Sequence, residues 1–221
     1  MKNLKKISLV IFDMDGLMFD TERIAADAWK SAGISSGIEI PDHLIQSIVG
    51  VNAKKSEEIF TDYFGKSFPY SEIRKIRLEY STKLIEKEGI PVKKGLHELL
   101  DFLSVRKISR AVATSTERQR TAFYLSKGEI SDKFDIIICG DEVKNSKPDP
   151  DIFLEAARRM GVTPDECIVL EDSENGLMAA YRAGMYPVLI PDIKRPCSEI
   201  MKIVYKEFKS LDEVKGLFAN S

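Results

Sequence analysis

Five short runs along the chain are apolar, rich in β-branched residues and hardly interrupted by polar positions. They occupy residues 7–12, 110–114, 135–139, 167–170 and 186–190. Such runs are typical of strands that are buried on both faces of a parallel sheet. Segments with helical periodicity separate the last four runs. Strands that alternate with helices in this way predict an α/β fold with a doubly wound parallel sheet.

The clearest of the intervening helices is expected between residues 149 and 161. Asp149 is a good N-cap residue, Pro150 suits the first helical position, and Gly161 ends the pattern. The apolar face of this helix consists of Phe153, Ala156, Ala157 and Met160. Another helix is expected between Gly95 and the second strand, with an apolar face of Leu96, Leu99, Leu100 and Leu103.

The first two strands are separated by a much longer segment, residues 13–109. A crossover helix needs only about a dozen residues. Helical patterns without a convincing strand fill the segment up to Ile90, and the clearest is a helix over 70–88 that ends at Gly89, with an expected stripe of Ile73, Ile76, Tyr80 and Leu84. Shorter amphipathic pieces lie at 21–31 and 52–64. We therefore predict a core of residues 1–17 and 91–221 with an inserted helical subdomain, residues 18–90.

Polar and acidic residues follow the predicted strands, at the sheet edge where ligands bind in open α/β folds. Strand one ends in Asp13-Met14-Asp15-Gly16 and strand two in Thr114-Ser115-Thr116. Strand four ends in Glu171-Asp172-Ser173, and Ser146-Lys147-Pro148 lies between strand three and the next helix. Because the strands are parallel, the four segments are expected to converge on one edge.

The acidic residues of these segments favour a metal site. Two carboxylates at Asp13 and Asp15 cannot both point into the core, and adding Glu171 and Asp172 is electrostatically costly unless a cation compensates them. Oxygen ligands beside a lysine suit Mg²⁺, which keeps several waters and is often completed by a substrate phosphate. The predicted cofactor is therefore Mg²⁺.

The same residues suit phosphoryl transfer. Asp13 is predicted to be the nucleophile, because a carboxylate is already ionised at neutral pH and needs no base to activate it. Asp15 is predicted to protonate the leaving oxygen and then to deprotonate water. Lys147, the Thr114 hydroxyl and the backbone N–H of Ser115 are expected to bind the phosphoryl oxygens.

Each segment has a plainer explanation when it is taken alone. The Asp13 and Asp15 pair could begin a calcium loop, but such a loop needs Glu at its twelfth position, where this chain has Ile24. Residues 114–116 could be a loop or a helix cap, and Lys147 could be a solvated surface lysine. Glu171 and Asp172 could cap the following helix. The interpretation as a catalytic site depends on all four segments falling at strand ends.

Composition limits the partners. The chain has 33 basic and 35 acidic residues, a net charge of −2, and no long run of one sign, which argues against binding to nucleic acid or an acidic membrane. The apolar start of the chain is too short for a signal peptide or a membrane span. Cys139, Cys167 and Cys197 are far apart and are expected to be packing residues in a reducing compartment. We therefore expect a cytoplasmic protein, a monomer, whose partner is a small phosphorylated metabolite.

Four motifs resemble those of the haloacid dehalogenase superfamily of hydrolases. They are Asp13-Met14-Asp15-Gly16, Thr114, Lys147-Pro148 and Glu171-Asp172. Residues 146–150, 170–176 and 183–185 resemble more narrowly the branch that contains β-phosphoglucomutase and phosphoglycolate phosphatase. The resemblance implies a Rossmann-like core with a helical cap inserted after strand one. It also implies Mg²⁺ bound by the Asp13 side chain, the Asp15 backbone carbonyl and Asp172, with Glu171 helping through water.

Within this resemblance we expect a phosphatase. Dehalogenases of the superfamily lack the second aspartate, which is present here as Asp15. The β-phosphoglucomutases carry a histidine, a lysine and an arginine in the cap where this chain has Ala25, Val49 and Ala53. A phosphosugar mutase is the alternative, and a non-catalytic binding protein is a third class that the intact motifs disfavour.

The substrate is expected to be selected by the cap. The helix entry at residues 20–22 and the loop over residues 49–54 should face the phosphate site. The residues assigned to specificity are Thr21, Gly50, Asn52 and Lys54.

Overall fold

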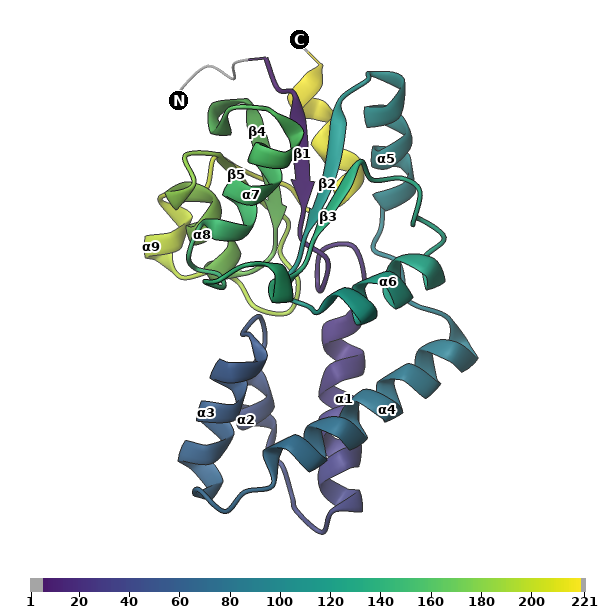
Figure 1. The fold of residues 1–221 in the computed structure, drawn as a ribbon, viewed down its shortest axis with the longest axis vertical. Helices are drawn as coiled ribbons and strands as arrows, with labels where there is room; N and C mark the ends of the chain where they lie inside the picture. The colour runs from purple at the N-terminus through teal and green to yellow at the C-terminus, as the bar shows by residue number, and fades with distance from the viewer. Residues whose placement is uncertain (1–5, 220–221) are drawn as a thin grey trace. The chain divides into compact units, whose positions relative to one another are not determined.

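The structure, a computed structural model, describes residues 6–219 of the chain (Figure 1). The chain divides into two compact units. Asp20–Pro91 forms one, and Met1–Phe19 together with Val92–Ser221 forms the other. The boundaries expected from the sequence, residues 18 and 90, differ from these by one or two residues. That the inserted unit works as a cap stays a prediction.

The larger unit is built on a parallel sheet. The described residues contribute β1 (Leu9–Phe12), β2 (Ser109–Ala113), β3 (Ile136–Ile138), β4 (Cys167–Glu171), β5 (Tyr186–Leu189) and β6 (Lys206–Glu207). Their order across the sheet is β3-β2-β1-β4-β5-β6, and every pair is parallel. The predicted α/β class is confirmed. The sequence did not predict β6, because its two residues, Lys206 and Glu207, form no apolar run.

Helices cover both faces of the sheet (Figure 1). On one face, α7 (Asp151–Met160) packs against β1, β2 and β3, and α8 (Glu174–Arg182) packs against β4 and β5. This face buries alternate strand residues, among them Leu9, Ile11 and Val169. On the other face, α5 (Leu96–Val105) contacts β2 and the 3₁₀ segment η3 (Leu211–Phe218). The four leucines predicted for α5 are all buried.

Further helical segments connect the strands of this unit. They are α6 (Arg118–Lys127), η1 (Gly140–Glu142), η2 (Pro164–Glu166) and α9 (Ser198–Met201). The predicted helix start at Asp149 is wrong by about one residue, since Pro150 is the N-cap and α7 begins at Asp151. Asp149 instead donates its N–H to the carbonyl of Ser146 at 3.0 Å, in the turn that precedes the helix. The predicted end is confirmed, because Gly161 adopts a left-handed φ of 67°.

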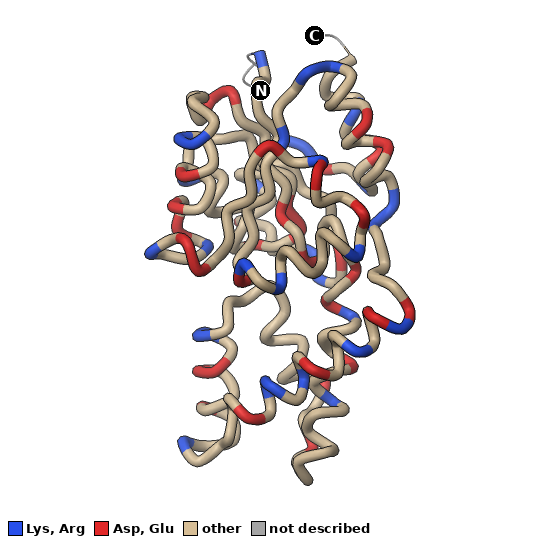
Figure 2. The backbone as a smooth tube through the Cα atoms, turned by 45° about the vertical axis from the view of Figure 1, so that its right-hand side comes forward, with Lys and Arg blue, Asp and Glu red and all other residues tan. Residues whose placement is uncertain are grey.

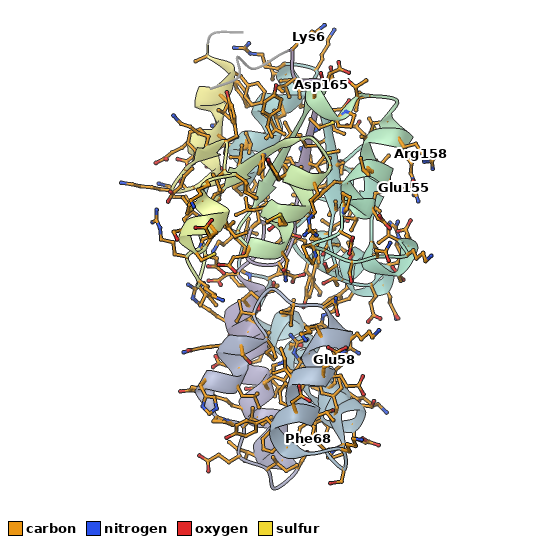
Figure 3. All side chains as sticks on the ribbon, turned by 90° about the vertical axis from the view of Figure 1, so that its left-hand side faces the viewer. Lys6, Glu58, Phe68, Glu155, Arg158 and Asp165 are labelled. Atoms are coloured by element: carbon orange, nitrogen blue, oxygen red, sulfur yellow. The ribbon has the colours of Figure 1, made fainter. Side chains whose placement is uncertain are left out.

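The inserted unit is helical, as expected. It consists of α1 (Thr21–Ser35), α2 (Asp42–Ser47), α3 (Ala53–Phe64) and α4 (Tyr70–Glu88). Its core is aromatic: Trp29 stacks on Phe60 with ring centroids 4.6 Å apart, and Tyr70 lies 5.7 Å from Trp29. Phe68, labelled in Figure 3, stacks on Phe64 at 4.6 Å. Trp29 is therefore a core residue of this unit.

The predicted apolar stripe of α4 is confirmed at Ile73, which is buried, and is wrong at Ile76 and Tyr80. Ile76 and Tyr80 are 37% and 42% exposed, whereas the buried residues are Tyr70, Ile73, Ser81 and Ile85. α4 packs against α1, and the small Ser81 allows a close approach. The Ser81 hydroxyl donates back to the carbonyls of Arg77 and Leu78 at 3.1 and 3.0 Å, so its burial leaves no donor unsatisfied.

Charges of both signs are interspersed along both units (Figure 2). Many are paired locally, such as Glu155 and Arg158 of α7, which are labelled in Figure 3 and lie 2.7 Å apart. Among the described residues, none of the helices is both long and apolar enough to cross a bilayer. Cys139 and Cys167 are buried, but Cys197 is exposed, so the expectation that all three cysteines are packing residues is wrong for Cys197.

Candidate active site

Strand ends position the acidic residues that the sequence singled out. Asp13 comes directly after β1, and its N–H donates to the carbonyl of Leu170 in β4 at 3.1 Å. Thr114 follows β2, and its N–H donates to the carbonyl of Ile138 in β3 at 3.1 Å. The hydrogen bonding of the sheet thus continues one residue past both strands. Both residues therefore stand on rigid backbone at the carboxyl edge of the sheet.

Lys147 joins this edge from the loop between η1 and α7. Its Nζ donates to Asp13 Oδ1 at 2.5 Å, to Glu171 Oε1 at 2.7 Å and to the Ala113 carbonyl at 3.0 Å. These bonds use all three donors of the ammonium group. The Lys147 side chain is only 5% exposed, so it is not the solvated surface lysine of the plainer explanation.

Glu171, the last residue of β4, is completely buried. Its Oε2 accepts from the N–H groups of Asp172 and Ser173 at 3.1 and 3.0 Å, and from the Ser173 hydroxyl at 2.9 Å. The N-cap of α8 is Ser173, whose side chain accepts from the N–H of Gly176. Glu171 and Asp172 are therefore not the caps that the plainer explanation supposed.

Two glycines make room for these carboxylates. A Cβ on Gly176 would lie 1.7 Å from Glu171 Oε1, far closer than any van der Waals contact allows. A Cβ on Gly16 would lie 2.4 Å from Asp172 Oδ2, and Gly16 also has a φ of +82°. The turn after Asp13 and the first turn of α8 can therefore approach the acidic residues only because both positions are glycine.

Three buried carboxylates gather at this edge. Asp13, Glu171 and Asp172 each offer an oxygen, and these oxygens lie within 4.8 Å of one another. Among the described residues, Lys147 is the one buried lysine or arginine, and its ammonium group offsets only part of this negative charge. A cluster of buried oxygen donors with excess negative charge fits a hard divalent cation such as Mg²⁺.

The pKa values of Asp13 and Lys147 are both shifted by burial and by the neighbouring charges. Burial, reinforced by the charge of Glu171, raises the pKa of Asp13 to about 8 even though Lys147 opposes the shift. Burial acts to lower the pKa of Lys147, but the carboxylates of Asp13 and Glu171 outweigh it, so that pKa is raised. The lysine therefore stays charged, and a further cation beside Asp13 would favour its ionised form.

Asp15 lies half-buried beside a residue to which the sequence assigned no role. The hydroxyl of Thr116 donates to Asp15 Oδ2 at 2.7 Å. The N–H of Thr116 donates to the hydroxyl oxygen of Thr114 at 3.1 Å. Thr116 thus contacts two predicted catalytic residues. The only sequence signal was a third hydroxyl residue in the segment after β2, which also holds the exposed Ser115.

The residues predicted to select the substrate all belong to the inserted unit. Thr21 is buried at the first position of α1, and Gly50 is exposed with a φ of 71°. Asn52 is the N-cap of α3, where its side chain accepts an N–H bond, and Lys54 is exposed in the first turn of that helix. Asn52 therefore has a clear structural role. Contact of the four with a substrate stays a prediction.

Comparison with known proteins bears on this arrangement. Residues 10–190 match the family described as haloacid dehalogenase-like hydrolase. A phosphorylated carbohydrates phosphatase of Thermotoga maritima is 33% identical over 80% of this chain and 81% of its own length. A β-phosphoglucomutase of Bacillus subtilis is 30% identical over 81% of each chain.

A solved structure agrees with these relatives. CbbY from Rhodobacter sphaeroides, crystallised in complex with phosphate, superposes with a TM-score of 0.81 at 25% identity, covering 94% of this chain and 96% of its own. The resemblance inferred from the four motifs is confirmed, and so is the prediction of a phosphoric monoester hydrolase at the level of enzyme class. Because the family match covers residues 10–190, which is most of the chain, this chain belongs to the haloacid dehalogenase-like hydrolases.

Proposed function

We propose that this protein hydrolyses a small phosphomonoester, a sugar phosphate or a similar metabolite, through a phosphorylated Asp13 and with Mg²⁺. The observation that carries the proposal is the buried contact of Asp13 with Lys147, beside Glu171 and Asp172. There the proposed nucleophile, a fixed cation and the proposed metal ligands come together from two strand ends and one loop. The phosphatase among the relatives supports the choice of reaction, and its name supports phosphorylated carbohydrates as the substrate class.

The residues that would hold Mg²⁺ are Asp13, Asp172 and the backbone carbonyl of Asp15. Glu171 would contribute indirectly, because its oxygens already accept bonds from Lys147, Asp172 and Ser173. When bound, the cation would offset the carboxylate charge, favour the ionised form of Asp13 and polarise a phosphoryl oxygen. Burial, together with the charge of Glu171, raises the pKa of Asp13 to about 8, and a cation bound beside it would oppose that shift.

The first chemical step belongs to Asp13. Its carboxylate attacks phosphorus, the bond between phosphorus and the ester oxygen breaks, and Asp15 donates its proton to the departing oxygen. Lys147 and the hydroxyl of Thr114 stabilise charge on the phosphoryl oxygens. The Thr114 hydroxyl oxygen accepts from the N–H of Thr116 at 3.1 Å, and its hydrogen would be donated to a phosphoryl oxygen.

The second step returns the enzyme to its starting state. Asp15, now ionised, removes a proton from water while that water attacks the phosphorus of aspartyl-phosphate. The bond between phosphorus and Asp13 breaks, inorganic phosphate leaves, and Asp15 keeps the proton for the next cycle. Asp15 thus acts as acid and base in turn.

A phosphosugar mutase is the second candidate, because a β-phosphoglucomutase is among the relatives. Such an enzyme must hold a second phosphate and keep water from its aspartyl-phosphate. At Ala25, Val49 and Ala53 this chain lacks the polar side chains that the mutases use, which supports hydrolysis.

The proposal is tested by phosphate release from a panel of sugar phosphates, phosphoglycolate, nucleotides and pyrophosphate, with Mg²⁺ present. We expect turnover of at least one sugar phosphate, loss of it in EDTA and its return with Mg²⁺. Asp13→Asn should keep the fold and abolish turnover, because an amide is a poor nucleophile. Acid quenching of the wild type should trap one phosphoryl group on the peptide that contains Asp13. Full activity of Asp13→Asn would remove the covalent mechanism.

A further inference from the structure

The segment between β2 and α6 holds Thr116 firmly at the backbone. Its N–H donates to the hydroxyl oxygen of Thr114 at 3.1 Å, and its carbonyl accepts from the N–H of Gly140 at 3.1 Å. A Cβ on Gly140 would lie 2.3 Å from the carbonyl oxygen of Ser115, so this close approach requires glycine. The Thr116 side chain therefore projects from a fixed point, and threonine is itself stiff about its first side-chain torsion.

The turn that carries Asp15 is fixed at the backbone as well. The N–H of Gly16 donates to the carbonyl of Phe19 at 2.9 Å, and the N–H of Met18 donates to the carbonyl of Met14 at 2.9 Å. The orientation of the Asp15 carboxyl group is then set by its side-chain torsions. The hydroxyl of Thr116 restricts these torsions by donating to Asp15 Oδ2 at 2.7 Å.

We propose that Thr116 is a positioning residue for catalysis: its hydroxyl holds the Asp15 carboxyl group in the orientation needed to deliver a proton to the leaving group and to receive one from water. The inference rests on the proposed function, in which Asp15 is the acid and base. A hydrogen bond to one carboxyl oxygen fixes the direction in which the other faces. Misplacement of a catalytic group by about 1 Å can cost on the order of 10²-fold in rate.

The test compares Thr116→Val, which deletes the hydroxyl and keeps the shape, with Thr116→Ser, which keeps the hydroxyl. We expect Thr116→Val to lower kcat by roughly 10²-fold with little change in KM, and Thr116→Ser to stay within a few-fold of the wild type. Thr116→Ala serves as a second deletion in case the valine variant folds poorly. Thr82→Val is the matched control, because the Thr82 hydroxyl donates within α4 to the carbonyl of Leu78 at 2.9 Å. It should keep wild-type kcat.

Leaving-group dependence separates positioning of Asp15 from a general structural role. An alkyl phosphate needs protonation of its leaving oxygen, whereas 4-nitrophenyl phosphate needs little. Thr116→Val should therefore slow the alkyl phosphate more in a single turnover. With 4-nitrophenyl phosphate it should release a burst of nitrophenolate equal to the enzyme present, since hydrolysis of aspartyl-phosphate still depends on Asp15. Equal loss on both substrates without a burst would contradict the inference.

Asp15→Asn separates failure of this inference from failure of the proposed function. If Asp15→Asn keeps full activity, the assigned role of Asp15 is wrong. If Asp15→Asn is severely impaired and Thr116→Val is not, only the inference about Thr116 is wrong. The double variant should be no slower than Asp15→Asn alone, because the hydroxyl acts through the carboxyl group. A further tenfold loss in the double variant would overturn the inference.

Discussion

At the residue scale, the central feature is a carboxyl group whose burial works against its charge. Asp13, the proposed nucleophile, would have to be ionised to attack phosphorus, yet burial raises its pKa to about 8. Lys147 Nζ donates to Asp13 Oδ1 at 2.5 Å and also to Glu171 Oε1 at 2.7 Å, so one ammonium group is shared by two carboxylates. A cation that binds such a cluster displaces the proton of the carboxyl group, so the affinity for the metal depends on pH.

This linkage predicts how stability depends on pH. In the metal-free protein the pKa of Asp13 is raised from 3.8 to about 8, so the folded state binds more protons than the unfolded state between those values. The contribution of Asp13 to stability is therefore greatest at acid pH and is lost as pH rises toward 8. If Mg²⁺ binds Asp13 as proposed, it replaces that proton, and the gain in Tm on adding Mg²⁺ should be larger at pH 8 than at pH 6.

Thermal unfolding with and without Mg²⁺ checks this prediction. Asp13→Asn is the control, and its Mg²⁺ gain should be small and nearly the same at both pH values. A wild-type gain that falls between pH 6 and pH 8 would contradict the assignment of Asp13 as a ligand.

The cysteines give a second prediction at this scale. Burial raises the pKa of Cys167 to about 12 and also raises the pKa of Cys139, whereas Cys197 is exposed. Only the thiolate reacts with alkylating agents. Iodoacetamide at pH 8 should therefore modify one cysteine of the folded protein and three after denaturation, as counted by mass spectrometry. Cys197→Ser should leave the folded protein unmodified.

At the element scale, helix starts position side chains around the site. The first turn of α8 runs so close to Glu171 that a Cβ on Gly176 would lie 1.7 Å from its carboxylate. Ser173 at the same helix start donates to Glu171 and accepts from Gly176. The end of β4 and the start of α8 are therefore packed and hydrogen-bonded together, and this arrangement holds Glu171 against Lys147.

Gly176→Ala should consequently displace the Glu171 carboxylate and weaken its bond to Lys147. We expect a loss of kcat of roughly 10²-fold together with a loss of about 1–3 kcal/mol in the free energy of unfolding, typical of overpacking. Urea unfolding and steady-state kinetics measure the two effects. Gly216→Ala is the control, since a Cβ there meets open space, and it should change neither by much. Unchanged kinetics in Gly176→Ala would show that the site tolerates a shift of Glu171.

Asn52 was assigned to substrate selection, and the structure shows it capping α3. Its side chain accepts from the N–H of Lys55 at 2.8 Å. Asn52→Ala should lower the free energy of unfolding by about 1 kcal/mol, and Asn52→Ser, another good cap, should restore it. If Asn52 also contacts the substrate, Asn52→Ser will restore stability and leave KM raised. If KM returns with stability, the specificity assignment is wrong.

At the scale of the whole molecule, we expect the inserted unit to determine the fate of the proposed aspartyl-phosphate. The absence of polar groups at Ala25, Val49 and Ala53 predicts that water, rather than a second sugar phosphate, accepts the phosphoryl group. Incubation with β-glucose 1-phosphate and its bisphosphate should therefore release inorganic phosphate without forming glucose 6-phosphate faster than it is hydrolysed. Steady conversion to glucose 6-phosphate with little phosphate release would favour the mutase.

Local sequence patterns were enough to locate the strands and the residues at their ends. An unbroken apolar run is stable only when it is buried, so the positions of β1, β2, β4 and β5 could be predicted within one or two residues. Asp13 and Glu171 were predictable candidates for the same reason, because a carboxylate at the end of such a run needs a compensating partner. The helical insertion followed from the length of residues 13–109.

The partner that each of these residues takes depends on its neighbours in the folded chain, and local patterns do not contain that information. The three bonds of Lys147, the bond from Thr116 to Asp15 and the close approach of Gly176 to Glu171 join residues that local patterns treat separately. Ser81 is buried in α4 while Tyr80 is exposed, because the neighbouring helix, and not hydrophobicity alone, selects the buried face. Periodicity depends on neighbours along the chain, whereas hydrogen bonding and packing depend on neighbours in space, and the latter form only when the chain has folded.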